Sequence, residues 1–391
     1  MRLGIDASNL KSGGGVTHLV GLLSVADPSA SGFTRVTVWG GEETLARLPV
    51  RTWLDPVHET SLDGSLARQL LFRRFDLSRR AALACDVLLV PGGSFSGSFR
   101  PFVTISRNAL PFEPREMRRY GFSATHLRLR LLRLSQAATF RRADGVIFLT
   151  RYAADRISAV AGARRGTSAR IPHGVDARFF LEPRPQRPVS EYSAARPFRL
   201  LYVSIIDVYK HQGAIAEAVA RLRAGGLPVT LDLVGDAYPP AARRLERTLR
   251  RLDPGGAFMR LRGALPHAAL HEAYAAADAF VFGSSCENMP NILLEAMAAG
   301  LPIASSNRGP MPEILGDAGI LFDPEEPIGL ARSLEAFVRD AEGRTRWARE
   351  AHERAKAFSW ERCAKETLDF TAEVGRGFRP GGVASEPHGA A

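Results

Sequence analysis

Two glutamates, Glu287 and Glu295, lie eight positions apart around the start of a predicted helix. An apolar run before them predicts a buried strand. Asn288 is the expected N-cap of the helix, with Pro290 in its first turn. The backbone N–H groups of a first helical turn lack partners within the helix and form an anion site. Carboxylates on both sides of that site would accept hydrogen bonds from hydroxyls. The pattern therefore suits a ligand with hydroxyls at both ends of a diphosphate, such as a nucleotide sugar.

The two glutamates belong to an ordered series of strand and turn signals. Residues 233–236 (Leu-Val-Gly-Asp) predict a strand that runs into a glycine turn, and further signals follow at 261–263, 276–281, 300–304 and 309–314. In order and spacing, this series resembles the donor-binding domain of retaining glycosyltransferases of the GT4 family, which have the GT-B fold. The resemblance covers most of the C-terminal half of the chain and, more weakly, the N-terminal half.

The resemblance implies roles for three residues. Glu287 would contact hydroxyls of the transferred sugar and stabilise positive charge at the anomeric carbon, and Glu295 would accept hydrogen bonds from the ribose hydroxyls. Lys210, after the first strand of the second half, would neutralise the leaving diphosphate. Glu287 and Lys210 are thus the candidate catalytic residues. The alternative is that all three are ordinary solvated side chains.

Further residues are implied to contact the donor. They come from the helix start, two turns in the second half and a run of three glycines after the first strand: Asn288, Met289, Asn291, Ile292, Gly235, Asp236, Leu265, Gly14 and Gly15. Backbone without side chains can approach a phosphate closely, although a plain flexible loop would have the same sequence. The glycines do not follow the G-x-G-x-x-G pattern with a later acidic residue, which disfavours a dinucleotide site.

Two positions depart from the family pattern. Ile205 stands where many relatives have an arginine five residues before the lysine. The first-domain loop that often carries a histidine has none, and reads Ser-Arg-Asn-Ala-Leu-Pro at 106–111. Arg107 and Asn108 remain candidates for contacts with sugar, phosphate or acceptor, and Asn108 fits a simple turn residue equally well. His173, where asparagine is common, fits a structural turn residue better than a base.

Composition indicates a globular protein large enough for two domains. The chain has 391 residues, 45% of them hydrophobic and 24% charged. Three widely spaced cysteines predict neither a disulfide framework nor a zinc site and fit a reducing cytosol. The N-terminal residues predict a strand and not a signal peptide, and no apolar run approaches the roughly 18 residues needed to cross a bilayer. We expect a cytoplasmic protein.

The net charge of +11 favours an anionic partner. Eight arginines and one acidic residue lie within 115–142, interleaved with leucines at 127, 129, 131, 132 and 134. An amphipathic basic helix of this kind would lie on anionic lipid headgroups, at the cytoplasmic face of a membrane. A solvated arginine-rich face is the alternative. Because no aromatic residues form a basic stacking platform, a nucleic-acid partner is disfavoured.

Strand-like runs alternate with helical patterns throughout, which is typical of α/β folds with parallel sheets. Strands are predicted at 3–6, 35–39, 87–90, 102–105, 146–149, 198–203, 229–234, 258–261, 279–282, 303–304 and 319–322. We predict an acceptor-side Rossmann-like domain at 1–180, a linker at 181–197, a donor domain at 198–357, a crossover helix at 358–374 and a disordered tail at 375–391. The two doubly wound domains are expected to face each other across a cleft, with the C-terminal helix crossing back to the first.

These observations predict a GT4-type retaining glycosyltransferase, a hexosyltransferase-type enzyme. It would move a sugar from a nucleotide diphosphate sugar to the hydroxyl of a glycan or lipid-linked acceptor, in the assembly of cell-surface polysaccharide or glycolipid. No cofactor or metal is expected, because no Asp-x-Asp motif stands in a donor loop. The alternatives are a non-catalytic nucleotide-sugar-binding partner with the same fold and another GT-B enzyme such as a nucleotide-sugar epimerase.

Overall fold

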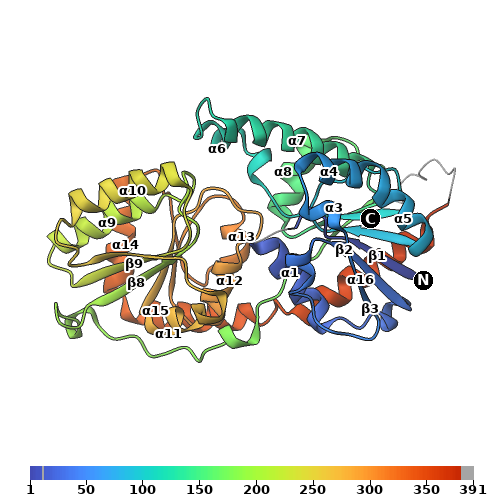
Figure 1. Cartoon of the computed structure of the whole chain (residues 1–391). Helices are drawn as coiled ribbons and strands as arrows, with labels where there is room; N and C mark the ends of the chain where they lie inside the picture. Colours follow the sequence, from blue (N-terminus) through green and yellow to red (C-terminus); the bar gives the residue numbers. More distant parts are fainter. Residues whose placement is uncertain (11–12, 380–391) are drawn as a thin grey trace. The chain divides into compact units, whose positions relative to one another are not determined.

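The chain divides into two compact α/β units, which a computed structural model describes over residues 1–10 and 13–379 (Figure 1). The first unit comprises the described residues of Met1–Glu113, Phe122–Gly174 and 360–379. The second comprises Pro114–Gly121 and Val175–Ser359. Each unit has its own parallel sheet, which confirms the predicted fold class.

The sheet of the first unit has seven parallel strands in the order β3-β2-β1-β4-β5-β6-β7. The strands are β1 (Arg2–Asp6), β2 (Arg35–Gly40), β3 (Leu54–His58), β4 (Val87–Val90), β5 (Phe102–Ser106), β6 (Gly145–Phe148) and β7 (Thr167–Arg170). The strand order reverses between β1 and β4, and such a switch point is where ligands of doubly wound sheets bind. The glycine-rich loop follows β1 and Arg107 follows β5, so both lie at the carboxyl edge of this sheet.

The helices of the first unit are α1 (Gly14–Val25), α2 (Glu42–Leu45), α3 (Thr60–Asp63), α4 (Leu66–Leu71), α5 (Leu77–Ala84), α7 (Ala124–Arg142), α8 (Arg151–Ala161) and α16 (Trp360–Gly377). The helices α7 and α8 begin at side-chain N-caps: the Ser123 hydroxyl accepts from the His126 N–H at 3.2 Å and the Thr150 hydroxyl from the Ala153 N–H at 3.1 Å. Phe72, Phe102 and Phe140 anchor the apolar core on one side of the sheet.

The second unit has six parallel strands in the order β10-β9-β8-β11-β12-β13. The strands are β8 (Phe198–Val203), β9 (Val229–Val234), β10 (Met259–Gly263), β11 (Ala279–Phe282), β12 (Ile303–Ser306) and β13 (Ile320–Phe322). The helices are α6 (Pro114–Arg118), α9 (Gln212–Ala224), α10 (Pro239–Leu252), α11 (Leu270–Ala276), α12 (Asn291–Ala298), α13 (Met311–Leu315), α14 (Pro327–Arg339) and α15 (Ala341–Ala355). Here the order reverses between β8 and β11, so the loops after these two strands are neighbours.

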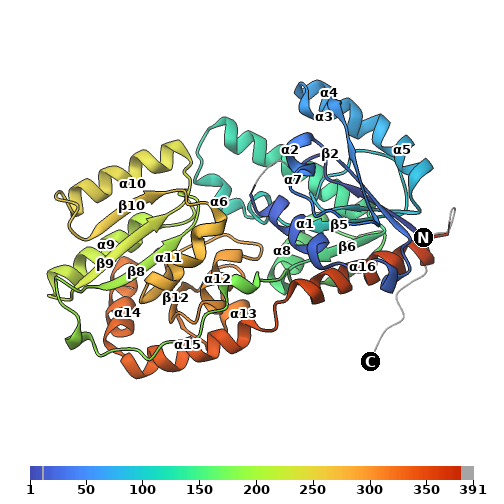
Figure 2. The same ribbon diagram turned by 60° about the horizontal axis from the view of Figure 1, so that its bottom comes forward.

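The last helix, α16, belongs to the first unit although the chain reaches it from the second, as predicted (Figure 2). It packs on α1 and on β4, β5 and β6, and Ser31 donates a hydrogen bond to Asp369 at 2.6 Å. The helix continues through Gly377. The prediction of a disordered tail from 375 is therefore wrong for residues 375–377. Gly375 packs there against Val87. The rest of the predicted tail, residues 380–391, lies outside the described part of the chain.

Two strands and two boundaries differ from the prediction. The strands β3 and β7 were not predicted. Both are edge strands of their sheet, so one side has no neighbouring strand and no continuous apolar run is needed. Pro56 within β3 is tolerated for the same reason. The predicted domain 1–180 is also wrong at its end and in its middle, because Val175 and the segment Pro114–Gly121 belong to the second unit. The predicted linker, 181–197, lies in that unit as well.

The packing of α16 on α1 requires a glycine at position 21. A Cβ atom there would lie 2.6 Å from the Trp360 ring, so Gly21→Ala should overpack the contact and lower the free energy of unfolding of the first unit by about 1–3 kcal/mol. Denaturant unfolding of the full chain measures the loss. Gly329→Ala is the matched control in α14, since its Cβ would meet only Glu326 at 3.8 Å. Equal stability of the two variants would contradict this account.

Candidate functional site

Lys210 and Glu287 form a largely buried ion pair at the switch point of the second unit. Lys210 follows β8 and Glu287 follows β11, and these strands are hydrogen-bonded neighbours. The Nζ atom of Lys210 contacts Oε1 of Glu287, and the two side chains are only 6% and 14% exposed. Nζ also lies 5.0 Å from the ring centroid of Tyr209 and 5.4 Å from that of Phe282, where the ring faces stabilise a cation. The structure thus brings together both predicted catalytic residues.

A chain of hydrogen bonds ties together the two loops that carry this pair. The Ser285 N–H donates to the Tyr209 carbonyl at 2.9 Å, and Ser285 Oγ lies 2.9 Å from Nε2 of His211 and 2.7 Å from Oε2 of Glu116. Burial lowers the pKa of His211 to about 4, so its ring is neutral at pH 7. One arrangement satisfies all three groups: Nε2–H of His211 donates to Ser285, which donates to the Glu116 carboxylate.

Glu116 reaches this site on α6, a segment that the sequence placed in the basic stretch facing a membrane. Its carboxylate accepts from Nε of Arg119 at 2.6 Å, and Arg119 and Arg115 both pair with Glu325. The basic helix predicted over 115–142 is divided into α6 and α7, and residues 114–121 belong to the second unit. Membrane binding by this stretch stays a prediction. No sequence signal linked Glu116 to Ser285, because the two are 169 positions apart.

Glu295 lies in α12 with its carboxylate held from two sides. The Tyr274 hydroxyl donates to Oε2 at 3.0 Å, and Nε2 of His267 lies 3.5 Å from Oε1. Tyr274 is fully buried, and burial followed by the Glu295 charge raises its pKa well above the ordinary value, so it remains a donor. Neither partner was predicted, since they come from α11 and from the turn before it without a local spacing rule. The carboxylate is oriented before any ligand arrives.

The helix that carries Glu295 begins two residues later than predicted. Pro290 is its N-cap and Asn291 its first residue, so the prediction of Asn288 as the N-cap is wrong. Asn288 and Met289 are instead buried in the preceding loop. The N–H groups of Asn291 and Ile292 stand in the first helical turn, where no intrahelical acceptor exists. The anion site predicted at Asn291 and Ile292 thus has the helix start that it requires, and phosphate binding there stays a prediction.

The other predicted donor-site residues of this unit lie at the ends of β9 and β10. Gly235 has a φ of 148° and a Cβ there would lie 1.9 Å from the Ser204 carbonyl oxygen, so no other residue fits. Asp236 accepts from the Ala237 N–H at 2.8 Å, and Leu265 is half-buried. None of these three forms a hydrogen bond or ion pair with the Lys210–Glu287 pair in the described residues.

The predicted residues of the first unit form a separate group at the carboxyl edge of its own sheet. Arg107 donates from Nη1 to the Gly15 carbonyl at 2.8 Å and from Nη2 to that of Gly14. Burial lowers the pKa of Arg107 to about 10, so it stays cationic at pH 7. Asn108 is exposed and accepts from the Leu110 N–H at 3.1 Å, as a turn residue does. His173 is buried and stacks on Trp360, with ring centroids 6.0 Å apart.

Within residues 1–10 and 13–379, no three His, Cys, Asp or Glu side chains gather as they would around a metal ion. Over the same residues, every helix is too short or too polar to cross a membrane.

The site has its counterpart in a known family. Residues 197–340, which include Lys210, Glu287 and Glu295, match the family model of glycosyl transferases group 1. This part of the chain is similar to that family. The predicted resemblance is confirmed.

Curated relatives match parts of the chain. O-antigen chain mannosyltransferase B of Escherichia coli is 34% identical over 29% of the chain and 29% of its own length. D-inositol 3-phosphate glycosyltransferase of Salinispora tropica is 30% identical over 46% of the chain and 39% of its own length. Glycogen synthase of Mycobacterium tuberculosis is 29% identical over 61% of the chain and 56% of its own length. The chain thus spans between about a third and about a half of these relatives.

Solved structures match nearly the whole chain at low identity. Sucrose-phosphate synthase from Thermosynechococcus elongatus aligns with a TM-score of 0.74 and 18% identity, covering 96% of this chain and 99% of that one. Anabaena Alr3699/HepE in complex with UDP and glucose aligns with a TM-score of 0.70 and 19% identity, covering 95% of this chain and all of that one. These likenesses show the fold, two Rossmann-like units of the GT-B kind.

The buried His211 predicts a pH-dependent stability. Its folded pKa of about 4 lies below the ordinary 6.5, so its contribution is complete above pH 6.5 and is lost as the pH falls through about 4. At 1.36 kcal/mol per pKa unit, the loss reaches about 3 kcal/mol at most. NMR titration should show the His211 ring protonating near pH 4. Between pH 6.5 and about 4, the free energy of unfolding should fall less for His211→Gln than for the wild type. A ring that titrates near pH 6.5 would contradict the burial argument.

Proposed function

We propose that the protein is a retaining glycosyltransferase that moves a sugar from a nucleoside diphosphate sugar to an acceptor hydroxyl. The observation that carries the proposal is the Lys210–Glu287 pair at the switch point of the second unit. Glu287 lies in the loop that leads into α12, the helix that carries Glu295. The match to glycosyl transferases group 1 supports it. No metal or cofactor has a part in the proposed reaction.

Each group of the site suits one part of the donor. The N–H groups of Asn291 and Ile292 and the Nζ of Lys210 would bind the diphosphate, because both present positive charge. The oriented carboxylate of Glu295 would accept from the two ribose hydroxyls. When the diphosphate binds, Lys210 shares its charge between two anions, and Glu287 becomes free to accept from hydroxyls of the sugar.

The proposed step breaks the bond between the anomeric carbon and the phosphate oxygen. The acceptor hydroxyl attacks the same face of the sugar, and the departing phosphate oxygen takes its proton, so that the products are the glycoside and the nucleoside diphosphate. Lys210 offsets the charge that grows on the leaving group, and Glu287 stabilises positive charge at the anomeric carbon. His211 is neutral at pH 7 and therefore supplies no acidic proton.

Two similar proteins support the proposed partners. The Escherichia coli relative is an O-antigen mannosyltransferase, and the HepE structure contains UDP and glucose. We propose a glycan or lipid-linked acceptor in the assembly of a cell-surface polysaccharide or glycolipid, and UDP-sugars are the first donors to test.

One observation favours a second candidate, a nucleotide-sugar-binding protein without turnover. Ile205 is 44% exposed at the position where the family pattern has an arginine, so Lys210 has no such cation beside it. Arg119 and Arg308, which flank the same part of the unit, are already paired with Glu325 and Asp323. A bound donor that is neither transferred nor hydrolysed, in the presence of a range of acceptors, would identify this second function.

The donor site can be tested with a panel of UDP-, GDP-, ADP- and TDP-sugars. Calorimetry should show binding of one nucleotide class to the wild type, and Glu295→Ala should weaken it by about tenfold or more, since two charge-assisted hydrogen bonds are lost. Lys210→Ala should lower the rates of sugar transfer and of donor hydrolysis by a larger factor than it lowers the affinity for the donor. Glu353→Ala, an exposed carboxylate on α15, is the control. Binding of no nucleotide sugar would contradict the proposal.

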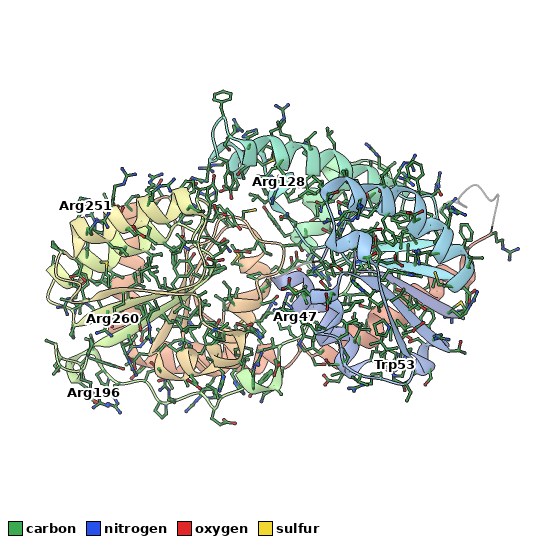
Figure 3. The ribbon with its side chains drawn as sticks, in the orientation of Figure 1. Arg47, Trp53, Arg128, Arg196, Arg251 and Arg260 are labelled. Carbon is green, nitrogen blue, oxygen red and sulfur yellow. The ribbon has the colours of Figure 1, made fainter. Side chains whose placement is uncertain are left out.

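We further propose that α7 docks the enzyme on an anionic membrane at the cytoplasmic face. Leu127, Leu131 and Leu134 recur at helical spacing on one face and are 60%, 59% and 67% exposed. Phe122 stands fully exposed just before the helix, and arginines flank the stripe. An exposed apolar stripe with flanking cations suits the interface of an anionic bilayer. Arginines also cover both units, as the labelled Arg47, Arg128, Arg196, Arg251 and Arg260 show (Figure 3).

The stripe makes a direct prediction. Leu127→Ser/Leu131→Ser should abolish co-sedimentation with vesicles that contain phosphatidylglycerol, because the buried apolar area is lost while the charge is unchanged. Ile328→Ser, which removes a 62% exposed side chain from the second unit, should have no effect. Unchanged sedimentation of the leucine variant would exclude α7 as the docking element. Donor hydrolysis in solution should be the same for all three proteins.

A further inference from the structure

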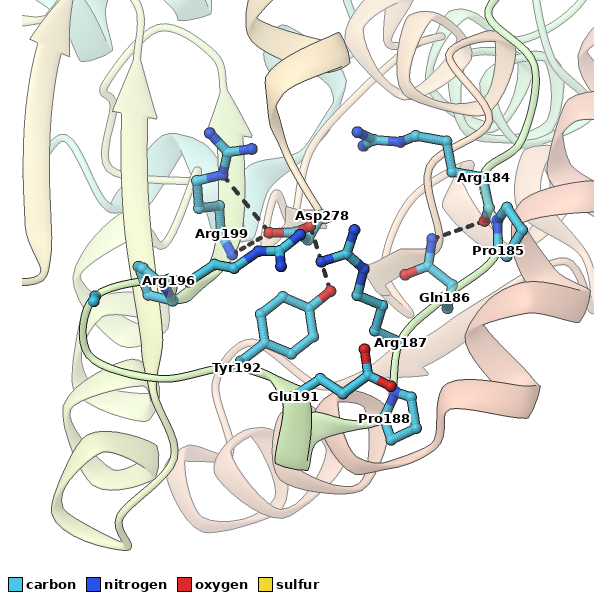
Figure 4. Close-up of a pocket in the computed structure, with 12 residues that line it drawn as sticks. Arg184, Pro185, Gln186, Arg187, Pro188, Glu191, Tyr192, Arg196, Arg199 and Asp278 are labelled. Atoms are coloured by element: carbon cyan, nitrogen blue, oxygen red, sulfur yellow. Dashed lines mark hydrogen bonds and ion pairs between the residues drawn. The ribbon is translucent and has the colours of Figure 1, made fainter.

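A second pocket lies in the second unit, at the opposite edge of its sheet from the donor site. It encloses about 770 Å³ and is lined by residues from the segment 184–197 before β8, by Arg199 and by Asp278 (Figure 4). Arg199 is the second residue of β8 and Asp278 immediately precedes β11. Lys210 and Glu287 follow the other ends of these same strands. Since β8 has six residues, the two sites are separated by roughly 20 Å of strand.

The pocket is lined by four arginines and only two acidic residues. The cations are Arg184, Arg187, Arg196 and Arg199, and the acids are Glu191 and Asp278. Asp278 is already engaged: it accepts from the Arg199 backbone N–H at 2.9 Å, and the Tyr192 hydroxyl lies 3.4 Å from its other oxygen. The side chain of Arg184 donates to the Ala277 carbonyl.

Two of these arginines have guanidinium groups with no acceptor. Within the described part of the chain, neither Arg187 nor Arg196 donates a side-chain hydrogen bond or forms an ion pair. Both extend toward Asp278 from the loop around Tyr192 (Figure 4). Unpaired like charges that converge on one pocket repel each other, and an anion between them would remove that repulsion.

A fifth arginine lies beneath the pocket and holds its wall in place. Arg344 is fully buried, donates to the carbonyls of Phe337 and Val338, and donates at 2.6 Å to the carbonyl of Arg187. Its guanidinium lies 5.0 Å from the ring centroid of Phe198. Arg344 forms no ion pair with a carboxylate in the described residues, so its charge adds to the positive potential of the pocket. The backbone at Arg187 is fixed before a ligand binds, which lowers the ordering cost of binding.

We propose that this pocket binds the phosphate groups of a diphosphate or phosphomonoester ligand, at a site distinct from the donor site. Planar guanidinium groups bind phosphate oxygens with paired hydrogen bonds, and two unpaired ones supply the fork geometry that phosphate needs. The volume lies within the range of small-molecule sites. The same phosphate chemistry occurs in soluble metabolites and in lipid headgroups. The inference does not depend on the proposed glycosyl transfer.

The test uses the full chain with inorganic pyrophosphate as the probe. Calorimetry is carried out in a Lys210→Ala background, so that the donor site contributes little, and repeated in the wild-type background in case that substitution disturbs the fold. Arg187→Gln/Arg196→Gln should weaken binding by about tenfold or more, and raised salt should weaken it further. Arg243→Gln/Arg250→Gln removes the same charge from exposed positions of α10 and should change binding by less than about twofold.

A second arm uses vesicles of phosphatidylcholine with phosphatidic acid to separate the two sources of phosphate, and every protein in this arm carries Leu127→Ser/Leu131→Ser so that α7 does not bind the vesicles itself. If the pocket variant loses pyrophosphate binding but keeps vesicle binding, the site is assigned to a soluble ligand. If it loses both, the site is assigned to a lipid headgroup that free phosphate can replace. Equal pyrophosphate and vesicle binding by the pocket and control variants would overturn the proposal. Both variants change exposed side chains, so matched thermal unfolding curves verify that the fold is intact.

Discussion

The buried ion pair between Lys210 and Glu287 is the interaction on which the donor-side site depends. Removing one partner of such a pair leaves an uncompensated charge in a site that excludes water, which typically costs about 3–5 kcal/mol. The pair persists because the loops that carry it follow neighbouring strands at the point where the sheet order reverses. The parallel topology thus places a cation and an anion side by side, and a phosphorylated sugar can exchange with that internal pairing.

Polar contacts from distant parts of the chain hold the surroundings of the pair in place. Ser285 links the loop of His211 to the carboxylate of Glu116, and Tyr274 orients Glu295 from inside the core. Satisfied buried networks of this kind fix one arrangement, because each unpaired member would be costly. The site is therefore rigid where it would bind the nucleotide and diphosphate. The free side of Glu287 is left for the variable part of the ligand.

Buried features were predictable from the sequence, and long-range partners were not. The central strands were found because parallel strands covered on both faces are continuous apolar runs, whereas the edge strands β3 and β7 lack such runs. Lys210, Glu287 and Glu295 were singled out by the resemblance of their surroundings to a family motif. Glu116 and Tyr274 did not, because only the fold brings them to their partners. The helix start was misplaced since Asn288 has N-cap chemistry but lies in a loop that continues to Pro290.

The most direct test of the account is a crystal structure of the protein with a bound nucleoside diphosphate, chosen by the binding panel. The account predicts the diphosphate against the N–H groups of Asn291 and Ile292 and within hydrogen-bond distance of Lys210, with both ribose hydroxyls on Glu295. It also predicts that Lys210 contacts the diphosphate as well as, or in place of, Glu287. A nucleotide bound elsewhere, or one whose ribose faces away from Glu295, would contradict the central claim.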